Sequence, residues 1–256
     1  MRSKRAEETK GRAASFEAAD ADFLAGYDPD EFAHPSLAVD VVIMSVVGDN
    51  LVVVLSRREE PPQKERWSLP GGFVGVSESL EHATHRVLHD KAGLADVYVE
   101  QLYTFGGVDR DPRTRVVSVA YLALVPAEKL KAISANATIA RVSAERHPGG
   151  GGVVRDEQGN VMSLAFDHEE IVAKAVTRLQ GKLEYAPVGY ELLESRFTLR
   201  ELQTIHEAIL GRGLNKDSFR KKVLTGGNVV ATGTREEGVK WRPAELYRFK
   251  SAPKKG

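Results

Sequence analysis

The sequence predicts an α/β domain followed by a smaller domain of two helices and a β-hairpin. Two β-branched runs, SLAVDVVIMSVV and LVVVLSRR, are separated by Gly48-Asp49-Asn50, which is typical of a hairpin. Residues 78–92 carry apolar side chains at helical spacing up to Gly93, which can end a helix. After residue 197, two amphipathic segments precede two short apolar segments, an order typical of a winged helix-turn-helix.

The remaining elements of the α/β domain follow from similar patterns. The segment EEPPQKERW has to be irregular, because Pro61 and Pro62 interrupt helices and strands alike. VYVEQLYTFG and VVSVAYLALVP are predicted to be strands. RHPGGGGVVRDEQGN is predicted to be a loop or a loose hairpin, and FDHEEIVAKAVTRLQGKL a helix capped by Asp167 or His168.

Capping signals define the two helices of the second domain. Thr198 and Glu201 form a capping-box pattern at the start of TLRELQTIHEAILG, and Gly211 with Gly213 makes the following turn. Asn215 is positioned to cap NKDSFRKKVLTG. The predicted apolar face of that helix consists of Phe219, Val223 and Leu224. NVVATGT and AELYRFK are predicted strands on either side of the wing TREEGVKWRP.

These patterns divide the chain into five segments. The predicted segments are an N-terminal arm (1–33), an α/β domain (34–180), a linker (181–196), a winged helix-turn-helix domain (197–250) and a basic tail (251–256). The linker contains the sequence KLEYAPVGYELL, and no internal repeat is present.

The composition is typical of a soluble, cytoplasmic protein. Of the 256 residues, 42 % are hydrophobic, so the chain can bury a substantial core. Cysteine is absent, which excludes disulfides and thiolate metal sites. The N-terminal MRSKRAEETKGR is charged, and no apolar run is long enough to span a bilayer, so we expect no membrane partner.

The formal net charge of zero conceals two oppositely charged parts. From Arg196 to the C-terminus there are 14 basic and 6 acidic residues, a charge of +8, which leaves −8 on the rest of the chain. This asymmetry predicts that the C-terminal domain binds a polyanion.

The segment from Gly72 to Leu94 has the outline of a Nudix box. That box is written as Gly, five residues, Glu, seven residues and Arg-Glu-U-x-Glu-Glu-x-Gly-U, where U is apolar. The residues in register are Gly72, Glu78, Arg86, Gly93 and Leu94. The three glutamates that would bind magnesium are replaced by Val87, Asp90 and Lys91. Because a hard cation needs several oxygen ligands held together, we expect no metal site, no catalytic residues and no enzyme activity.

A pocket that keeps this outline could still bind a nucleoside diphosphate. Lys91 would place an ammonium where the metal would lie, and could neutralise part of the diphosphate charge. Alternatively, Lys91 is a solvated lysine on a degenerate enzyme. The other candidate effector-binding residues are Arg57, Phe73, Phe105 and Arg110. The arginines could pair with phosphate oxygens and the phenylalanines could stack on a base, although a core role fits the phenylalanines better.

Two other patterns resemble sites but lack the necessary residues. His82, His85 and His89 are predicted to face solvent, opposite the apolar stripe, and no carboxylate completes a zinc pattern. The glycines of 149–152 resemble a phosphate loop, but no Lys-Ser or Lys-Thr pair follows them. The sequence therefore predicts no metal and no cofactor.

The second helix of a helix-turn-helix enters the DNA major groove. The side chains predicted to point outward from this helix are Lys216, Ser218, Arg220 and Lys221. The candidates in the wing are Arg235, Lys240 and Arg242. Lysine suits phosphates, while arginine can also read guanine. A basic helix followed by a basic hairpin is not readily explained as an ordinary solvated surface.

Together the two domains resemble the Nudix-related transcriptional regulators of NAD metabolism. The resemblance rests on YDPDEFAHPSLAVDVVI, LPGGFVGVSESLEHA, DRDPRTRVVSVAYLAL, AFDHEEIVAKAVTRLQGKLEY, FTLRELQTIHEAILGRGLNKDSFRKKVL and RPAELYRF. It implies a homodimeric repressor that binds a palindromic double-stranded DNA operator through two winged helices. It also implies an ADP-ribose-type nucleotide effector, bound in the Nudix domain, that weakens DNA binding.

Three other functions stay open at this point. The chain could be an active Nudix pyrophosphohydrolase with an accessory nucleic-acid-binding domain, although the missing carboxylates argue against this. It could be a related regulator that senses a sugar or a sugar phosphate. Finally, the basic domain could bind a protein partner instead of DNA.

Overall fold

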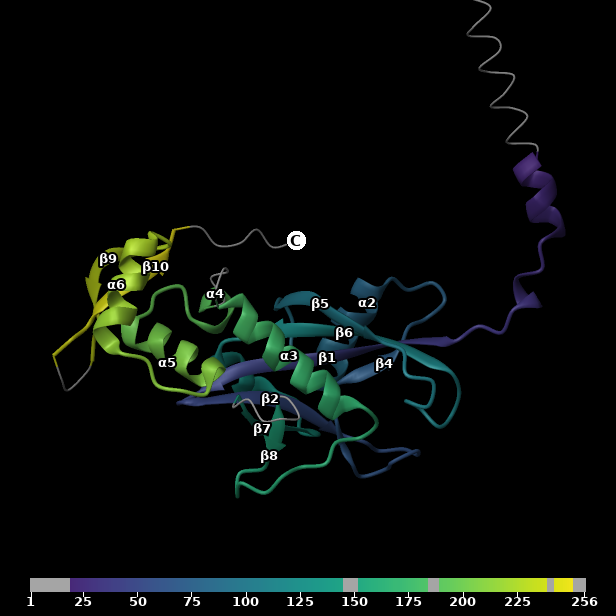
Figure 1. Cartoon of the computed structure of the whole chain (residues 1–256), viewed down its shortest axis with the longest axis horizontal. Helices are drawn as coiled ribbons and strands as arrows, with labels where there is room; N and C mark the ends of the chain where they lie inside the picture. Colours follow the sequence, from purple (N-terminus) through teal and green to yellow (C-terminus); the bar gives the residue numbers. More distant parts are fainter. Residues whose placement is uncertain (1–18, 145–151, 184–188, 239–241, 251–256) are drawn as a thin grey trace, which may run out of the picture. The chain divides into compact units, whose positions relative to one another are not determined.

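The computed structural model describes residues 19–144, 152–183, 189–238 and 242–250 (Figure 1). Residues up to Pro35 form a unit of their own, distinct from the unit Ser36–Gly256. Within this N-terminal unit, residues 19–26 are helical and Pro29–Glu31 form the 3₁₀ turn η1. Asp28 caps η1, because its carboxylate accepts a hydrogen bond from the Asp30 amide.

A mixed β-sheet forms the centre of the second unit. Its strands are β1 (Ser36–Val47), β2 (Asn50–Arg57), β3 (Trp67–Ser68), β4 (Gly71–Phe73), β5 (Tyr98–Phe105), β6 (Val116–Leu124), β7 (Ala137–Ser143) and β8 (Val153–Arg155). The main path runs β5-β6-β1-β2-β7-β8, with β3 beside β2 and β4 beside β1. Strands β1 and β6 are parallel, and β1 and β2 form the predicted antiparallel hairpin.

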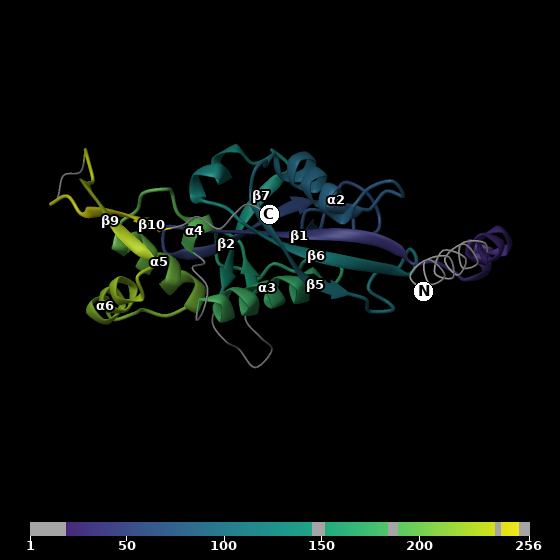
Figure 2. The same cartoon turned by 90° about the horizontal axis from the view of Figure 1, so that it is seen from above.

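The central strand β1 is buried on both faces of the sheet, which explains its unbroken apolar sequence. Its side chains alternate between two cores, with Val42 and Met44 in one and Val41 and Ile43 in the other. Helix α3 (His168–Lys182) contributes to the first core and α2 (Leu80–Val87) to the second. The sheet is thus the middle layer of an α/β/α sandwich, as Figure 2 shows.

The helix of the Nudix-like segment is shorter than the predicted 78–92. Ser79 caps α2 by accepting a hydrogen bond from the His82 amide. The chain then continues as a π-helical turn, η2 (Leu88–Ala92), and ends at Gly93, whose φ of 71° suits glycine, as predicted. Because a π turn has more residues per turn than an α-helix, regular α-helical spacing does not apply to η2. A 3₁₀ segment, η3 (Ala127–Ala132), follows β6.

The C-terminal domain has the predicted order of helix, turn, helix and hairpin. Its elements are α4 (Gly189–Leu192), α5 (Leu199–Leu210), α6 (Lys216–Gly226), β9 (Val229–Arg235) and β10 (Glu245–Phe249). The capping box is confirmed, because Thr198 accepts from the Glu201 amide and Glu201 accepts from the Thr198 amide. Asn215 caps α6 as predicted.

A small core holds this domain together. Its buried residues are Phe197, Leu199, Leu202, Phe219, Val229 and Tyr247. The expectation that Leu224 belongs to the apolar face of α6 is wrong, since Leu224 is 41 % exposed while Val223 is partly buried. Leu224 follows Phe219 by five residues, so its side chain has turned about 140° away from the core around the helix axis.

The two domains of this unit share a core. Helix α3 extends to Lys182 and α4 begins at Gly189, while residues 184–188 lie outside the described part of the chain. The core on the α3 side also contains Ile205, Ala208 and Ile209 of α5. Within the described ranges, no helix has both the length and the apolar character of a membrane span.

Gly71 gives a first test of this packing. A Cβ atom at Gly71 would lie 2.3 Å from Oδ1 of Asp40 and 2.9 Å from the Val39 carbonyl oxygen. We expect Gly71→Ala to lower the free energy of unfolding by about 1–3 kcal/mol, because one of these atoms is backbone and the other belongs to a short, buried side chain. Urea denaturation measures the change.

The matched control is Gly181→Ala, in the last turn of α3. An added Cβ there has no atom within 4 Å. Alanine in a helix should instead stabilise the protein, by about 0.5–1 kcal/mol. Equal effects of the two substitutions would show that the contact with Asp40 is not what requires glycine at position 71.

Candidate functional site

A cavity of about 710 Å³ opens beside the N-terminal half of β1. Its walls come from segments that are far apart in the sequence. They include residues of β1, the end of β2 and the following loop, β4, the π turn, the loop after β5, and the chain entering α3. Because these segments carry most of the charged and aromatic residues of the Nudix-like motifs, the cavity is the first candidate site.

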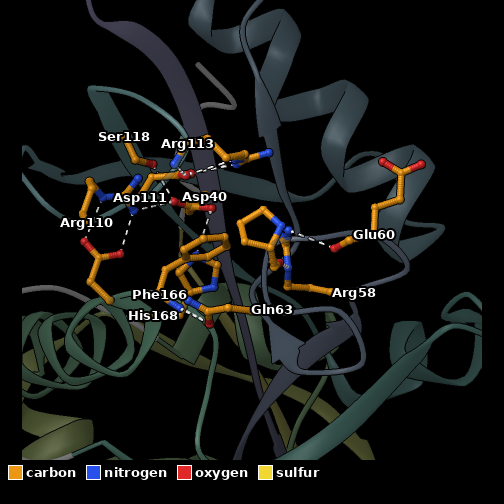
Figure 3. Close-up of polar contacts among 12 residues, drawn as sticks. Asp40, Arg58, Glu60, Gln63, Arg110, Asp111, Arg113, Ser118, Phe166 and His168 are labelled. Carbon is orange, nitrogen blue, oxygen red and sulfur yellow. Dashed lines mark hydrogen bonds and ion pairs between the residues drawn. The ribbon is translucent and has the colours of Figure 1, made fainter.

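Asp40 lines this cavity, and Figure 3 shows the polar contacts of its carboxylate. Asp40 is 6 % exposed and projects from the central strand β1. Its Oδ2 accepts a hydrogen bond from the Ser118 hydroxyl at 2.6 Å and one from the Arg110 guanidinium at 3.3 Å. Its Oδ1 lies 3.5 Å from Nε2 of His168. A buried charge needs such partners, because desolvation without them costs several kcal/mol, roughly.

His168 is a neutral imidazole in this arrangement. It is almost completely buried, and its Nδ1 accepts a hydrogen bond from the Leu69 amide at 2.8 Å. The accepting Nδ1 carries no proton, so the ring proton is on Nε2, which faces Asp40. Burial lowers the pKa of His168, although the charges of Asp40 and Asp167 oppose this effect.

Arg110 lines the cavity as predicted, but its charge is already engaged. The guanidinium donates to both carboxylate oxygens of Asp167, at 2.8 and 2.7 Å, and also to Asp40. Its side chain is 5 % exposed. Burial alone would lower the pKa of Arg110, but the two carboxylates raise it. Arg110 therefore joins β1 to the start of α3, and has little capacity left for a ligand phosphate.

A cluster of cations and aromatic rings forms another wall, and of its members only Phe73 was a candidate from the sequence. The Arg58 guanidinium lies 4.6 Å from the centre of the Phe166 ring, and that of Arg113 lies 5.0 Å from the Phe73 ring. Burial and the nearby charge of Arg113 lower the pKa of Arg58. Arg113 is held by Asp111, whose carboxylate accepts at 2.7 Å. Arginine stacked on an aromatic ring suits recognition of a planar ligand.

Two of the candidate effector-binding residues, Arg57 and Lys91, are exposed cations that line the cavity. Arg57 forms an exposed ion pair with Glu65, at 2.5 Å, which can exchange for another anion. Lys91 is exposed and also lines the cavity. Its ammonium has no carboxylate partner among the residues that the structure describes. Lys91 is therefore available to an anionic ligand.

The two phenylalanine predictions differ in outcome. Phe73 lines the cavity and is 44 % exposed. Phe105 does not line this cavity and is buried in the core on the α3 side, which is the role that the sequence favoured for it. A bulge in β5 between Gln101 and Tyr103 breaks the strict alternation of side chains, so Leu102 and Phe105 share one face.

Glu78 and Asp90 of the Nudix-like segment are engaged in other contacts. Glu78 receives hydrogen bonds from Arg86 at 2.7 and 2.8 Å, and these with the Gly75 amide lower its pKa to about 2. Asp90 contacts His89, and the position of the first box glutamate is the buried Val87. In the described part of the chain, no group of three or more His, Cys, Asp or Glu side chains could hold a metal ion.

The second candidate site is the basic surface of α6 and the wing. Four residues of α6 point outward as expected, and these are Lys216, Ser218, Arg220 and Lys221. In the wing, Arg235 and Arg242 are exposed, whereas Lys240 lies outside the described residues. Phe219 anchors the opposite side of α6 in the small core. The exposed cations of α6 and of the wing therefore suit a polyanionic partner.

Side chains of α5 fix the turn that leads to α6. Gln203 donates to the Leu214 carbonyl at 3.0 Å, and Glu207 accepts from the Leu214 amide at 2.8 Å. The ring of His206 lies edge-on to that of Phe219. Burial and the charge of Lys222 lower the pKa of His206 to about 4.

Comparison with known proteins matches both domains to described families. Residues 189–249 match the NrtR DNA-binding winged helix domain, and residues 34–143 match the NUDIX domain. A relative from Acinetobacter baylyi, named "ADPR responsive transcriptional repressor NtrR", is 37 % identical over 229 residues, which cover 89 % of this chain and 87 % of the relative. The chain belongs to the NrtR family.

Solved structures of similar proteins agree with the NrtR architecture. Shewanella oneidensis NrtR complexed with a 27mer DNA superposes with a TM-score of 0.68 at 33 % identity, covering 84 % of this chain and 93 % of that chain. A MutT/nudix family protein from Enterococcus faecalis superposes with a TM-score of 0.71 at 28 % identity, covering 91 % of this chain and 93 % of that chain.

A second relative found by sequence matches a shorter part of the chain. This ADP-ribose pyrophosphatase from Methanocaldococcus jannaschii is 32 % identical over 145 residues, covering 55 % of this chain and 73 % of the relative.

His206 makes the stability of this NrtR-family chain depend on pH. Its pKa is lowered from 6.5 to about 4, so the folded state resists protonation that the unfolded state accepts. The stabilisation is fully present above pH 6.5 and is lost as the pH falls towards 4, at up to about 1.4 kcal/mol per pH unit. Denaturation of the wild type and of His206→Leu between pH 7.5 and 4.5 isolates this contribution.

The wild type should lose stability relative to His206→Leu over that interval. Buried His168 titrates in both proteins, so its effect cancels in the difference. A difference that stays constant with pH would contradict the assignment of a neutral, buried His206.

Proposed function

We propose that this chain is a transcriptional repressor that binds operator DNA through its winged helix and senses an ADP-ribose-type nucleotide through its Nudix domain. The observation that carries the proposal is that one chain combines a cation-lined cavity with a basic recognition helix. No cluster of metal-binding side chains is found in the described part of the chain. The Acinetobacter relative, whose name describes an ADPR-responsive repressor, supports both halves.

The cavity offers the groups that a nucleoside diphosphate requires. Its volume of about 710 Å³ is within the range of small-molecule sites. Lys91 and Arg57 at the rim can neutralise phosphate oxygens, and an arginine fork adds directional hydrogen bonds. Phe73 presents an exposed aromatic face on which a base can stack. A sugar phosphate would use the cations but would leave this aromatic face without a planar partner.

We expect Lys91→Ala to weaken ADP-ribose binding about tenfold, equivalent to about 1.4 kcal/mol, because it removes a cation that has no other partner among the described residues. Calorimetry on the full chain measures the affinity. The control is Lys64→Ala, which removes an exposed lysine that does not line the cavity. Unchanged affinity in Lys91→Ala would make Lys91 an ordinary solvated lysine, and tighter binding of sugar phosphates than of ADP-ribose would reassign the effector.

We further propose that the nucleotide is bound without being hydrolysed. Nudix hydrolysis requires a cation to activate water and to hold the diphosphate. Here the residues at the glutamate positions are Val87, Asp90 and Lys91, and Glu78 is held by Arg86. A lysine supplies positive charge but does not lower the pKa of a bound water as a metal does.

Incubation with ADP-ribose and Mg²⁺ should therefore yield no AMP at ordinary enzyme rates, which begin at about 1 per second. The affinity measured by calorimetry should be the same with Mg²⁺ and with a chelator. Rapid, magnesium-dependent cleavage would instead establish the alternative, an active hydrolase, which the archaeal pyrophosphatase relative favours.

The DNA-binding half of the proposal follows from α6. Lysine and arginine side chains on its exposed side can contact phosphates and base edges. We propose that two chains form a homodimer on a palindromic operator, with half-sites about 34 Å apart, which is one helical turn. ADP-ribose is what remains of NAD after loss of nicotinamide, so a repressor released by it would report NAD turnover and suits control of NAD-metabolism genes.

We expect Lys221→Ala to weaken DNA binding to a similar degree for all DNA sequences, as the loss of a phosphate contact would. The slope of the logarithm of the binding constant against the logarithm of the salt concentration should fall in magnitude by about 1. Fluorescence anisotropy with duplexes from the adjacent promoter, over a salt series, measures both quantities. Arg141→Ala is the control, since Arg141 is an exposed cation on β7 of the Nudix sheet. DNA binding that ignores salt, or that both variants reduce equally, would favour a protein partner for this surface.

A further inference from the structure

Helix α3 contacts the cavity at one end and the winged helix at the other. At its start, Phe166 and His168 line the cavity, and Asp167 holds the guanidinium of Arg110. Asp167 is the N-cap residue, but its side chain makes no cap hydrogen bond and is used for Arg110 instead. The side chain of the N-cap residue therefore bonds the cavity wall in place of its own helix.

The other end of α3 is joined to the DNA-binding domain by Gln180. Its side-chain amide donates one hydrogen bond to the Ala144 carbonyl, at 2.7 Å, and another to the Ile209 carbonyl, at 3.1 Å. Ile209 lies in the last turn of α5, where helix carbonyls lack an intrahelical partner. One side chain thus connects the end of β7, the end of α3 and the end of α5.

The helix between these two ends is packed into one continuous core. Helix α3 has 15 residues and is about 22 Å long. Its buried face, including Ile171, Val176 and Leu179, shares a core with Ile205 and Ala208 of α5. Close-packed interiors transmit displacement instead of absorbing it. From α5 the path continues to α6, because the turn between them is fixed by hydrogen bonds between α5 side chains and the backbone of Leu214.

The entry to α3 contains a strained backbone position. Phe166 has a φ of 55°, in the left-handed region that a bulky side chain rarely occupies. Its ring lies in the cavity wall against the Arg58 guanidinium, and its amide donates to the Gln63 side chain at 3.0 Å. Figure 3 shows Phe166 with Arg58, Gln63 and His168. A ligand that draws Arg58 or displaces the Phe166 ring would change the direction in which the chain enters α3.

We propose that α3 carries the effector signal from the cavity to the DNA-binding surface, with Gln180 as the positioning residue at the joint with α5. The proposal rests on the function proposed above and names the route of its regulation. Occupation of the cavity shifts the strained entry at Phe166, α3 follows, and Gln180 passes the shift to the end of α5. Gln180 does not line the cavity and belongs to α3 and not to α6 or the wing, so we assign it a role in the coupling between the two sites.

The test compares the coupling of three full-length proteins: the wild type, Gln180→Leu and Thr177→Ala. The coupling is the ratio of operator dissociation constants with and without saturating ADP-ribose, and we expect it to lie between about 5 and 150 for the wild type. In Gln180→Leu the ratio should fall at least threefold towards 1, roughly, because the joint is lost. Thr177 is exposed, and its hydroxyl bonds only within α3, so its substitution should leave the ratio unchanged.

Separate binding measurements distinguish a coupling role from a merely structural one. Gln180→Leu should keep the wild-type affinity for ADP-ribose without DNA and for DNA without ADP-ribose. A wild-type ratio in Gln180→Leu would overturn the route through Gln180 and leave the proposed function intact. A ratio of 1 in the wild type would overturn the proposed function itself.

Hydrogen exchange on the wild type decides the matter if Gln180→Leu does not fold. Addition of ADP-ribose should change the exchange of amides at the C-terminal end of α3 and in the last turn of α5. Changes confined to residues that line the cavity would overturn the proposal.

Discussion

The buried carboxylate of Asp40 is the constraint on which the cavity depends. A charge in this position is stable only when donors surround it, and those donors come from β6, the loop after β5 and the start of α3. Gly71 has to lack a side chain so that β4 can pair beside it. Asp40 therefore fixes where three otherwise unrelated segments meet, and with them the position from which α3 crosses the sheet.

The same reasoning explains why the outline of the Nudix box is kept without its metal ligands. Arg86 donates to Glu78 and to the Phe73 carbonyl, and Glu78 accepts from the Gly75 amide. These contacts hold the loop after β4, which carries the exposed Phe73 of the cavity wall. The Glu and Arg of the box thus have a structural role that does not depend on magnesium. The residues that differ from the Nudix box, Val87, Asp90 and Lys91, stand at the positions of the glutamates that bind magnesium.

Features set by local chemistry could be predicted from the sequence, and features set by distant contacts could not. The hairpin at Gly48, the capping box of Thr198 and the helix end at Gly93 each depend on a few neighbouring residues. Arg58, Arg113 and Phe166 form a wall only because the fold joins segments that are distant in the sequence, and no local pattern marks them. The bulge in β5 likewise has no sequence signal, and it is what places Phe105 in the core.

A sensor and a hydrolase make opposite demands on one diphosphate pocket. A ligand shifts a conformational equilibrium only by its difference in affinity for the two states, and only while it stays intact and bound. A metal ion would strengthen binding but would also activate water against the ligand. In the proposed site, the positive charge comes instead from Lys91 and Arg57, which are side chains of the protein and not a bound ion. Binding energy obtained in this way can act on the protein backbone at Phe166 instead of on the bond between the phosphates, which is what a regulator of DNA binding requires.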